Sequence, residues 1–290
     1  MRPLLLSWTG AAYPPGLRPP RPDIAIPPLP AGAEWIGEPI DSIDRLVATR
    51  PVLVHFFDFA QLNSVRTIPY LRAWHDRYSG DGLAFVGVHS PRFPFTQDYD
   101  IVADAAERLE VGWPVIVDRE FGVWRMYEPH GWPALFLWGR GGALRWYQLG
   151  EGDYNGTEEA IRETLAAGNG GDHEWPPLLE PLRPSDAPDA RVIPPTPELF
   201  PGGSTETPWP TADADRELEL EYEAGGAYAA TDGEGEITIR VDGEPRDPVE
   251  VSVPGLQELT AHDRTERHAL RLEPSPGVLI YSIQFAAGVP

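Results

Sequence analysis

Apolar and polar positions change their period along the chain, and these changes divide it into two structured regions. In the first region, continuous apolar runs such as PVLVHFF (residues 51–57) and LAFVGVHS (residues 83–90) alternate with segments whose apolar positions recur every three or four residues. Continuous runs are typical of strands that are buried on both faces, and the longer spacing is typical of amphipathic helices. We therefore expect alternating strands and helices around a parallel core.

The end of the first region has a different pattern. The segment PALFLWGRGGALRWYQLG (residues 133–150) consists of two apolar runs joined by Gly-Arg-Gly-Gly, which predicts an antiparallel hairpin. The segment NGTEEAIRETLAAG then predicts a helix, with Asn155 and Glu158 spaced as a capping box and Gly168 as its stop. The predicted order of elements is β-α-β-α-β-β-α.

From about residue 215 onward, apolar and polar residues alternate with a period of two, as in ELELEYEA and EITIRV. Short alternating segments separated by turn residues are typical of an all-β sandwich or jelly roll. Proline-rich segments flank the structured regions. The chain is thus predicted to contain an N-terminal extension (1–33), an α/β domain (34–167), a linker pinned in places against a domain (168–214) and a β-sandwich domain resembling a carbohydrate-binding module (215–290).

Composition limits the classes of partner. The chain has 290 residues and a formal net charge of -22, which repels phosphate backbones and anionic lipid headgroups. No run of about 20 apolar residues is present, and the three leucines near the N-terminus are too few for a secretory signal. We expect a cytoplasmic protein that neither binds nucleic acid nor inserts into membranes.

The absence of cysteine excludes several kinds of chemistry. With no cysteine in the sequence there are no disulfides, thiolate metal sites, iron–sulfur clusters or cysteine nucleophiles. The seven histidines show no spacing typical of metal ligands, and the glycine-rich segments match turns better than phosphate-binding loops. We expect neither a metal nor a cofactor.

One stretch links the sequence to a known family. The run FFDFAQLNSVRTIPYLRAW (residues 56–74) resembles the active-site segment of the DipZ and TlpA-like thiol–disulfide oxidoreductases, and GVHSPRFPF, PVIVD, GWPALFL and GEGDY resemble later blocks of that family in the same order. VDGEP and GVLIYSIQF are similar to the β-sandwich that follows the DipZ thioredoxin-like domain. The resemblance implies an α/β thioredoxin fold followed by an all-β sandwich.

The resemblance fails at the catalytic residues. Gln61 and Ser64 stand where the family has its two reactive cysteines, with Leu62 and Asn63 between them. Disulfide exchange needs a thiolate that attacks and a second thiol that resolves the mixed disulfide. Neither an amide nor an alcohol can replace these groups, so we expect no catalytic residue and no redox activity at this position.

Two alternatives concern Ser64 and His55. Activated by His55, Ser64 would be a hydrolytic nucleophile, but no Gly-x-Ser-x-Gly motif surrounds it and no acid is placed to orient the histidine. We expect Ser64 to cap a helix. The resemblance places His55 on the first strand, beneath the active-site segment, where we expect a buried histidine with satisfied hydrogen bonds.

The dipeptide Trp132–Pro133 matches the second half of the family's site. The resemblance implies a cis peptide bond that faces the former cysteine positions and leaves adjacent backbone able to pair with an extended peptide. A purely structural role for this kink in shaping the sheet is the alternative. The predicted groove has apolar walls and two polar contacts, namely Phe57, Phe59, Leu62 and Trp132, with Gln61 and Asn63.

Three functions remain open at this point. The first is a redox-inactive thioredoxin-like protein that binds a peptide or protein partner in its former active-site groove. The second is a structural scaffold, and the third is an enzyme with non-thiol chemistry at Asp58, His55 or Glu151. Carbohydrate is a weaker candidate ligand of the C-terminal domain, where Tyr222, Tyr228 and Tyr281 belong either to the core or to a binding platform.

Overall fold

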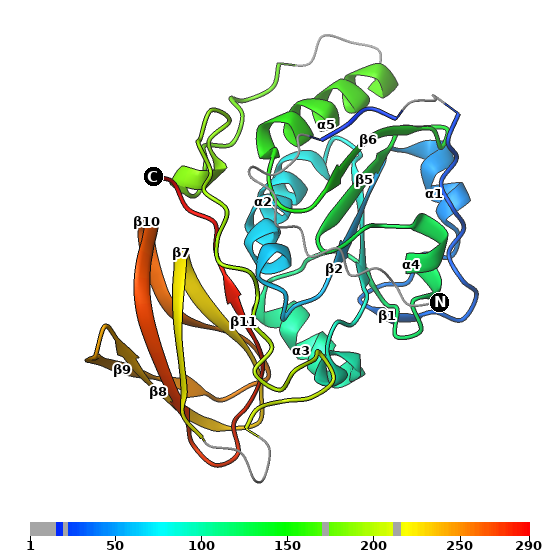
Figure 1. The fold of residues 1–290 in the computed structure, drawn as a ribbon. Coiled ribbons are helices and arrows are strands. Elements are labelled where there is room, and N and C mark those ends of the chain that lie inside the picture. Colours follow the sequence, from blue (N-terminus) through cyan, green and yellow to red (C-terminus); the bar gives the residue numbers. More distant parts are fainter. Residues whose placement is uncertain (1–15, 20–22, 170–173, 211–215) are drawn as a thin grey trace.

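The computed structural model describes residues 16–19, 23–169, 174–210 and 216–290. The remaining parts of the predicted N-terminal extension and linker lie outside the described residues, namely 1–15, 20–22, 170–173 and 211–215. In Figure 1 an α/β domain and a β domain lie side by side, and the segment between them in sequence runs back over both.

The α/β domain is built on one six-stranded sheet with the order β1-β4-β3-β2-β5-β6. Strands β2, β3 and β4 are parallel to one another, β5 runs antiparallel to β2, and β6 forms a hairpin with β5. This is the predicted parallel core with an antiparallel hairpin. The strands are β1 (Glu34–Ile36), β2 (Val52–Phe57), β3 (Ala84–His89), β4 (Val115–Val117), β5 (Ala134–Trp138) and β6 (Leu144–Leu149).

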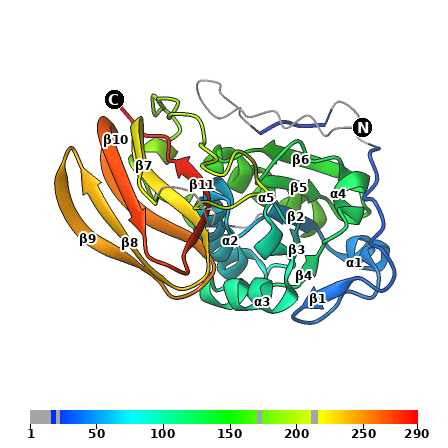
Figure 2. The same cartoon turned by 60° about the horizontal axis from the view of Figure 1, so that its bottom comes forward.

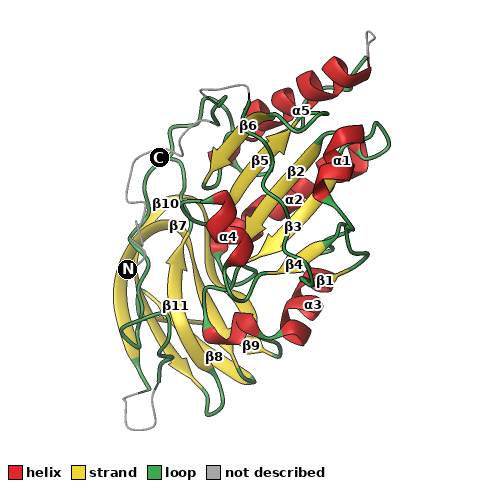
Figure 3. Cartoon of the chain, turned by 90° about the vertical axis from the view of Figure 1, so that its right-hand side faces the viewer, coloured by secondary structure: helices red, strands yellow, loops and turns green. Residues whose placement is uncertain are grey.

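Helices cover both faces of this sheet. Residues of α2 and α5 share a buried cluster with Leu53 and Phe57 of β2, whereas residues of α1 and α4 pack with Val52, Val54 and Phe56 from the opposite face. Figure 3 shows α1 and α4 in front of the sheet and α2 behind it. The helices are α1 (Ile43–Thr49), α2 (Leu62–Tyr78), α3 (Tyr99–Arg108), α4 (Gly122–Tyr127) and α5 (Tyr154–Asn169), with short 3₁₀ turns η1 (Pro94–Gln97) and η2 (Pro184–Asp186).

The predicted order of elements is confirmed, and the structure adds β1, α1 and α4 to it. None of the helices in the described part of the chain is long and apolar enough to cross a bilayer. The capping box predicted for α5 is wrong. Asp153 accepts the N–H of Gly156 at 3.2 Å, and the buried Glu158 carboxylate instead accepts hydrogen bonds from Trp74, Tyr78 and other groups.

The β domain is one antiparallel sheet of five strands in the order β11-β7-β10-β8-β9. Its two longest strands, β7 and β10, curve strongly, so the sheet curls around its own apolar core (Figure 1). The predicted all-β domain is confirmed, as a single curled sheet. The strands are β7 (Leu218–Asp232), β8 (Gly235–Val241), β9 (Glu244–Val251), β10 (Gly255–Pro274) and β11 (Leu279–Phe285).

The described part of the 168–214 segment is fixed to both domains. Tyr70 of α2 receives a hydrogen bond from the N–H of Leu182 and donates one to Asp186. Further along, Leu199 and Trp209 form isolated bridges with Ile283 and Ile280 of the edge strand β11. These contacts cover the open edge of the β sheet and hold it against the α/β domain.

Candidate functional site

The segment that resembles the family's active site connects β2 to α2. Gln61 has extended dihedral angles, and its side-chain Oε1 accepts the N–H of Ser64 at 2.8 Å, so Gln61 is the N-cap of α2. Ser64 lies inside the first turn, where its hydroxyl accepts the N–H of Asp58 at 3.4 Å. The prediction that Ser64 caps the helix is wrong, because the helix begins at Leu62, three residues before the position that a cap at Ser64 requires.

The structure brings Trp132–Pro133 close to this segment. Their peptide bond is cis. Ala134, the next residue, lies opposite Phe56 in the sheet, and the indole N–H of Trp132 donates to the carbonyl of Ser90 at 3.0 Å. Since the N–H of Ser90 donates to the carbonyl of Phe57, both halves of the predicted site meet at the same end of β2.

Most of the predicted groove residues are covered. Phe57, Phe59, Leu62 and Ser64 are each at most 3% exposed, and Pro133 is also buried. Partial exposure remains for Gln61, Asn63 and Trp132. The predicted apolar walls of the groove are therefore not open to an external partner in this arrangement, and only its polar contacts and Trp132 reach solvent.

The C-terminal domain supplies the cover. The side chain of Gln284, on β11, donates from Nε2 to the carbonyl of Ala60 and accepts the N–H of Leu62 at Oε1, both at 2.7 Å. Gln284 is 3% exposed, and Figure 2 shows β11 as the strand of the β domain nearest to α2. A primary amide carries one donor side and one acceptor side, so this residue satisfies two backbone groups of the segment at once.

An apolar cluster extends this contact. It combines Phe59, Phe93 and Phe95 of the α/β domain with Ala230 and Tyr281 of the β domain. The Tyr281 ring lies 5.0 Å from that of Phe95, centroid to centroid, and is 6% exposed. Tyr281, like the buried Tyr222, thus belongs to a core and not to a carbohydrate platform.

The carboxylates of the two acidic residues considered for non-thiol chemistry both make hydrogen bonds or ion pairs within the protein. Asp58 is fully buried and accepts hydrogen bonds from the N–H groups of Ala60 and Arg92 and from the hydroxyl of Thr96. Glu151 is 1% exposed and forms ion pairs with Arg66 and Arg183. These contacts are those expected of structural carboxylates that fix loops and helices.

Two histidines lie under the segment without hydrogen-bond partners. Both ring nitrogens of His55 and of His89 are buried and have no hydrogen-bond partner among the described residues, although Nε2 of His89 lies 3.9 Å from the Asp58 carboxylate. The expectation that His55 is satisfied is therefore wrong; its ring stacks on Phe57 at 4.9 Å instead. Burial lowers the pKa of His55 to about 3, and burial also lowers the pKa of His89 although the Asp58 carboxylate opposes it. Both rings are neutral at pH 7.

Sequence reasoning missed two features. Gln284 lies more than 220 residues from its partners, and nothing in the run VLIYSIQF sets it apart from an ordinary strand residue. The spacing His262-x3-Glu266-x-His268 matches no common metal motif, yet the structure places these three side chains together in the β domain. The seven histidines thus include one arrangement that spacing alone did not reveal.

Comparison with known proteins identifies relatives of both regions. Protein DipZ of Mycobacterium bovis is 27% identical over 298 aligned residues, which cover 89% of this chain and 42% of DipZ. The thiol-disulfide oxidoreductase YkuV of Bacillus subtilis is 25% identical over 141 residues, covering 49% of this chain and 94% of YkuV. No protein-family model matches the chain.

Among solved structures, a thiol-disulfide isomerase from Corynebacterium glutamicum is 21% identical with a TM-score of 0.44, and the match covers 48% of this chain and 96% of that one. The chain spans about two fifths of the length of DipZ. It carries a thioredoxin-like domain of the DipZ and TlpA-like thiol–disulfide oxidoreductase family, one without any cysteine that could exchange a disulfide.

Proposed function

We propose that this protein is a redox-inactive, thioredoxin-like binding protein whose former active-site segment (residues 58–64) binds the chain's own C-terminal domain. The observation that carries the proposal is the pair of 2.7 Å hydrogen bonds between Gln284 and the backbone of Ala60 and Leu62. The segment that in an oxidoreductase must stay open to substrate is here a domain interface.

Burial and charge support this assignment. Ala60, Leu62 and Gln284 are each at most 3% exposed, and they lie beside the apolar cluster around Tyr281. A buried backbone group that loses its partner costs about 1–3 kcal/mol, so the amide contributes directly to domain docking. The linker also contributes to the contact between the domains. Its Glu198 forms an ion pair with Arg92, whose backbone N–H donates to Asp58.

Gln284→Ala tests the proposal. We expect faster backbone hydrogen exchange in the peptide covering residues 58–66, because Leu62 loses the acceptor of its N–H group. The matched control is Gln257→Ala, which removes a partly exposed glutamine of the same domain whose side chain donates to the carbonyl of Val253. Equal exchange of residues 58–66 in the wild type and in Gln284→Ala would contradict the proposed docking role.

A peptide or protein partner at the outer part of the site is a second candidate. One observation favours it: Trp132 is partly exposed, and its ring lies 4.5 Å from that of Trp124, so two indoles form a surface next to the cis proline. Paired aromatic rings at a site rim are common anchors for partners. A partner that uses this surface should be lost on Trp132→Ala and retained on Gln284→Ala.

A further inference from the structure

A bulge in the β domain creates a group of side chains that a regular strand would keep apart. Along β10, pairing with β7 passes from Ala261 opposite Gly226 directly to Glu266 opposite Ala224, so the intervening residues of β10 loop out. Bulges of this kind re-aim side chains and are frequent next to functional sites. Here the bulge places His262 over Glu266 and His268.

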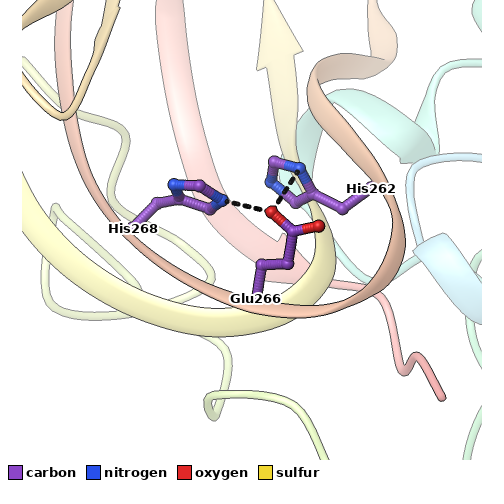
Figure 4. Close-up of side chains that lie close together, drawn as sticks. All are labelled: His262, Glu266 and His268. Carbon is purple, nitrogen blue, oxygen red and sulfur yellow. Dashed lines mark hydrogen bonds and ion pairs between the residues drawn. The ribbon is translucent and has the colours of Figure 1, made fainter. Parts of the chain in front are cut away.

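The three side chains converge on one point. Figure 4 shows both imidazoles directed toward the Glu266 carboxylate. The distance to Glu266 Oε2 is 4.0 Å from Nδ1 of His262 and 3.1 Å from Nε2 of His268. One ligand atom from each residue lies within 4.8 Å of the other two.

The remaining ring nitrogens are held by outer partners. Nε2 of His262 is hydrogen-bonded to the hydroxyl of Tyr222 at 2.8 Å, and Nδ1 of His268 is hydrogen-bonded to the carboxylate of Asp242 at 2.7 Å. Metal-ligating histidines nearly always have such a partner on the second nitrogen, because it fixes the tautomer and the orientation of the ring. Each imidazole is thus oriented with its other nitrogen facing Glu266.

We propose that His262, Glu266 and His268 bind a zinc ion. Tetrahedral coordination with bonds of about 2.0–2.1 Å puts neighbouring ligand atoms about 3.3 Å apart, which lies between the two distances to Glu266. Two imidazoles with one carboxylate favour zinc over calcium or magnesium, which prefer oxygen ligands. The ion fastens the bulge of β10 to the strand that follows it.

The site is accessible to an ion from solvent. The side chain of Glu266 is 50% exposed, whereas those of His262 and His268 are 14% and 17% exposed.

Calorimetric titration of the tag-free, chelator-treated full chain with zinc sulfate tests the proposal. We expect one zinc per chain, a tenfold to hundredfold weaker affinity in Asp242→Asn, and a larger loss in Glu266→Gln or His268→Ala. His130→Ala is the matched control, since it removes an exposed histidine distant in sequence, and it should leave zinc binding unchanged.

Three results would overturn the proposal: absence of zinc binding, zinc affinity that is the same in Glu266→Gln as in wild type, or tighter binding of calcium or magnesium than of zinc. Circular dichroism of each zinc-free variant shows whether the fold is retained. If His268→Ala does not fold, Glu266→Gln decides the question, because it keeps the size of a half-exposed side chain.

Discussion

The α/β domain and the β domain each contain a pair of histidines, and the surroundings of the two pairs differ. His55 and His89 are at most 2% exposed, and none of their ring nitrogens has a hydrogen-bond partner among the described residues. His262 and His268 are partly exposed, and each has one nitrogen held by an outer partner. Depth of burial therefore does not identify the pair that is organised to bind.

The two pairs of histidines make different kinds of contact. Beneath the former active-site segment the imidazoles serve as flat aromatic rings, stacked on Phe57 and Phe59. In the β domain, the oriented imidazoles share an acidic neighbour and reach solvent. The segment that the sequence marks most clearly is covered by β11, whereas the histidine group proposed to bind zinc is one that its spacing in the sequence did not reveal.

The largest expected effect is the loss of folding stability at low pH that the buried histidines His55 and His89 cause. Unfolded histidine takes up a proton near pH 6.5, whereas folded His55 does so only near pH 3, and the pKa of His89 is also lowered by burial. Between these values the unfolded state binds more protons, so stability rises with pH and is lost on acidification. His55 should contribute a loss of about 1.4 kcal/mol per pH unit below about pH 6, and His89 adds a loss of the same sign.

Urea denaturation at several values between pH 7 and pH 5 measures this effect. His55→Phe retains a flat ring against Phe57 and should reduce the pH slope by about 1.4 kcal/mol per pH unit in the lower part of this range. The difference between variant and wild type cancels the other titrating groups, and His130→Phe is the exposed control. An unchanged slope in His55→Phe would mean that this ring is charged in the folded protein, which would break the contrast between the two pairs.

Sequence alone predicted the α/β domain well, for physical reasons visible in its residues. The runs at 51–57 and 83–90 are apolar at most positions because both faces of β2 and β3 are covered by helices. The hairpin follows from its Gly-Arg-Gly-Gly turn, and the position of the former active site follows from the run at 56–74. All of these signals are local.

What sequence could not predict depends on contacts between distant residues. The Gln284 contact forms only after two domains dock, and the His262 group forms only where β10 gains residues relative to β7. Serine is the commoner capping residue, so the sequence favours Ser64 as the helix cap, yet the backbone conformation places Gln61 at the cap position. The sequence could not predict how much of the groove is exposed, because β11 covers it only when the two domains are docked.

The second-largest expected effect concerns how far the Gln284 contact blocks access to the former active site. The wild-type protein should not accelerate insulin reduction by dithiothreitol, because it has no thiol. Gln61→Cys combined with Ser64→Cys restores a dithiol beneath the Gln284 contact. Adding Gln284→Ala to this pair should raise the rate about tenfold, since one hydrogen bond to a buried group is worth about 1.4 kcal/mol.

The matched control for this experiment is the same cysteine pair with Gln257→Ala, which changes a partly exposed amide outside the contact. Similar rates with and without Gln284→Ala would show that β11 does not close the site. The former active site would then be as accessible as the histidine group of the β domain, and the comparison between a closed and an open site would fail.

The smallest expected effect concerns Gln61 itself. Gln61→Ala removes the acceptor of the Ser64 N–H and should lower the free energy of unfolding by about 1 kcal/mol. Gln61→Ser should restore most of the loss, because serine also caps helices. Asn63→Ala, next to it on the partly exposed surface, is the control. Equal unfolding free energies for Gln61→Ala and wild type would leave the Gln61 amide free for a partner, and the segment would then be less closed than its contacts indicate.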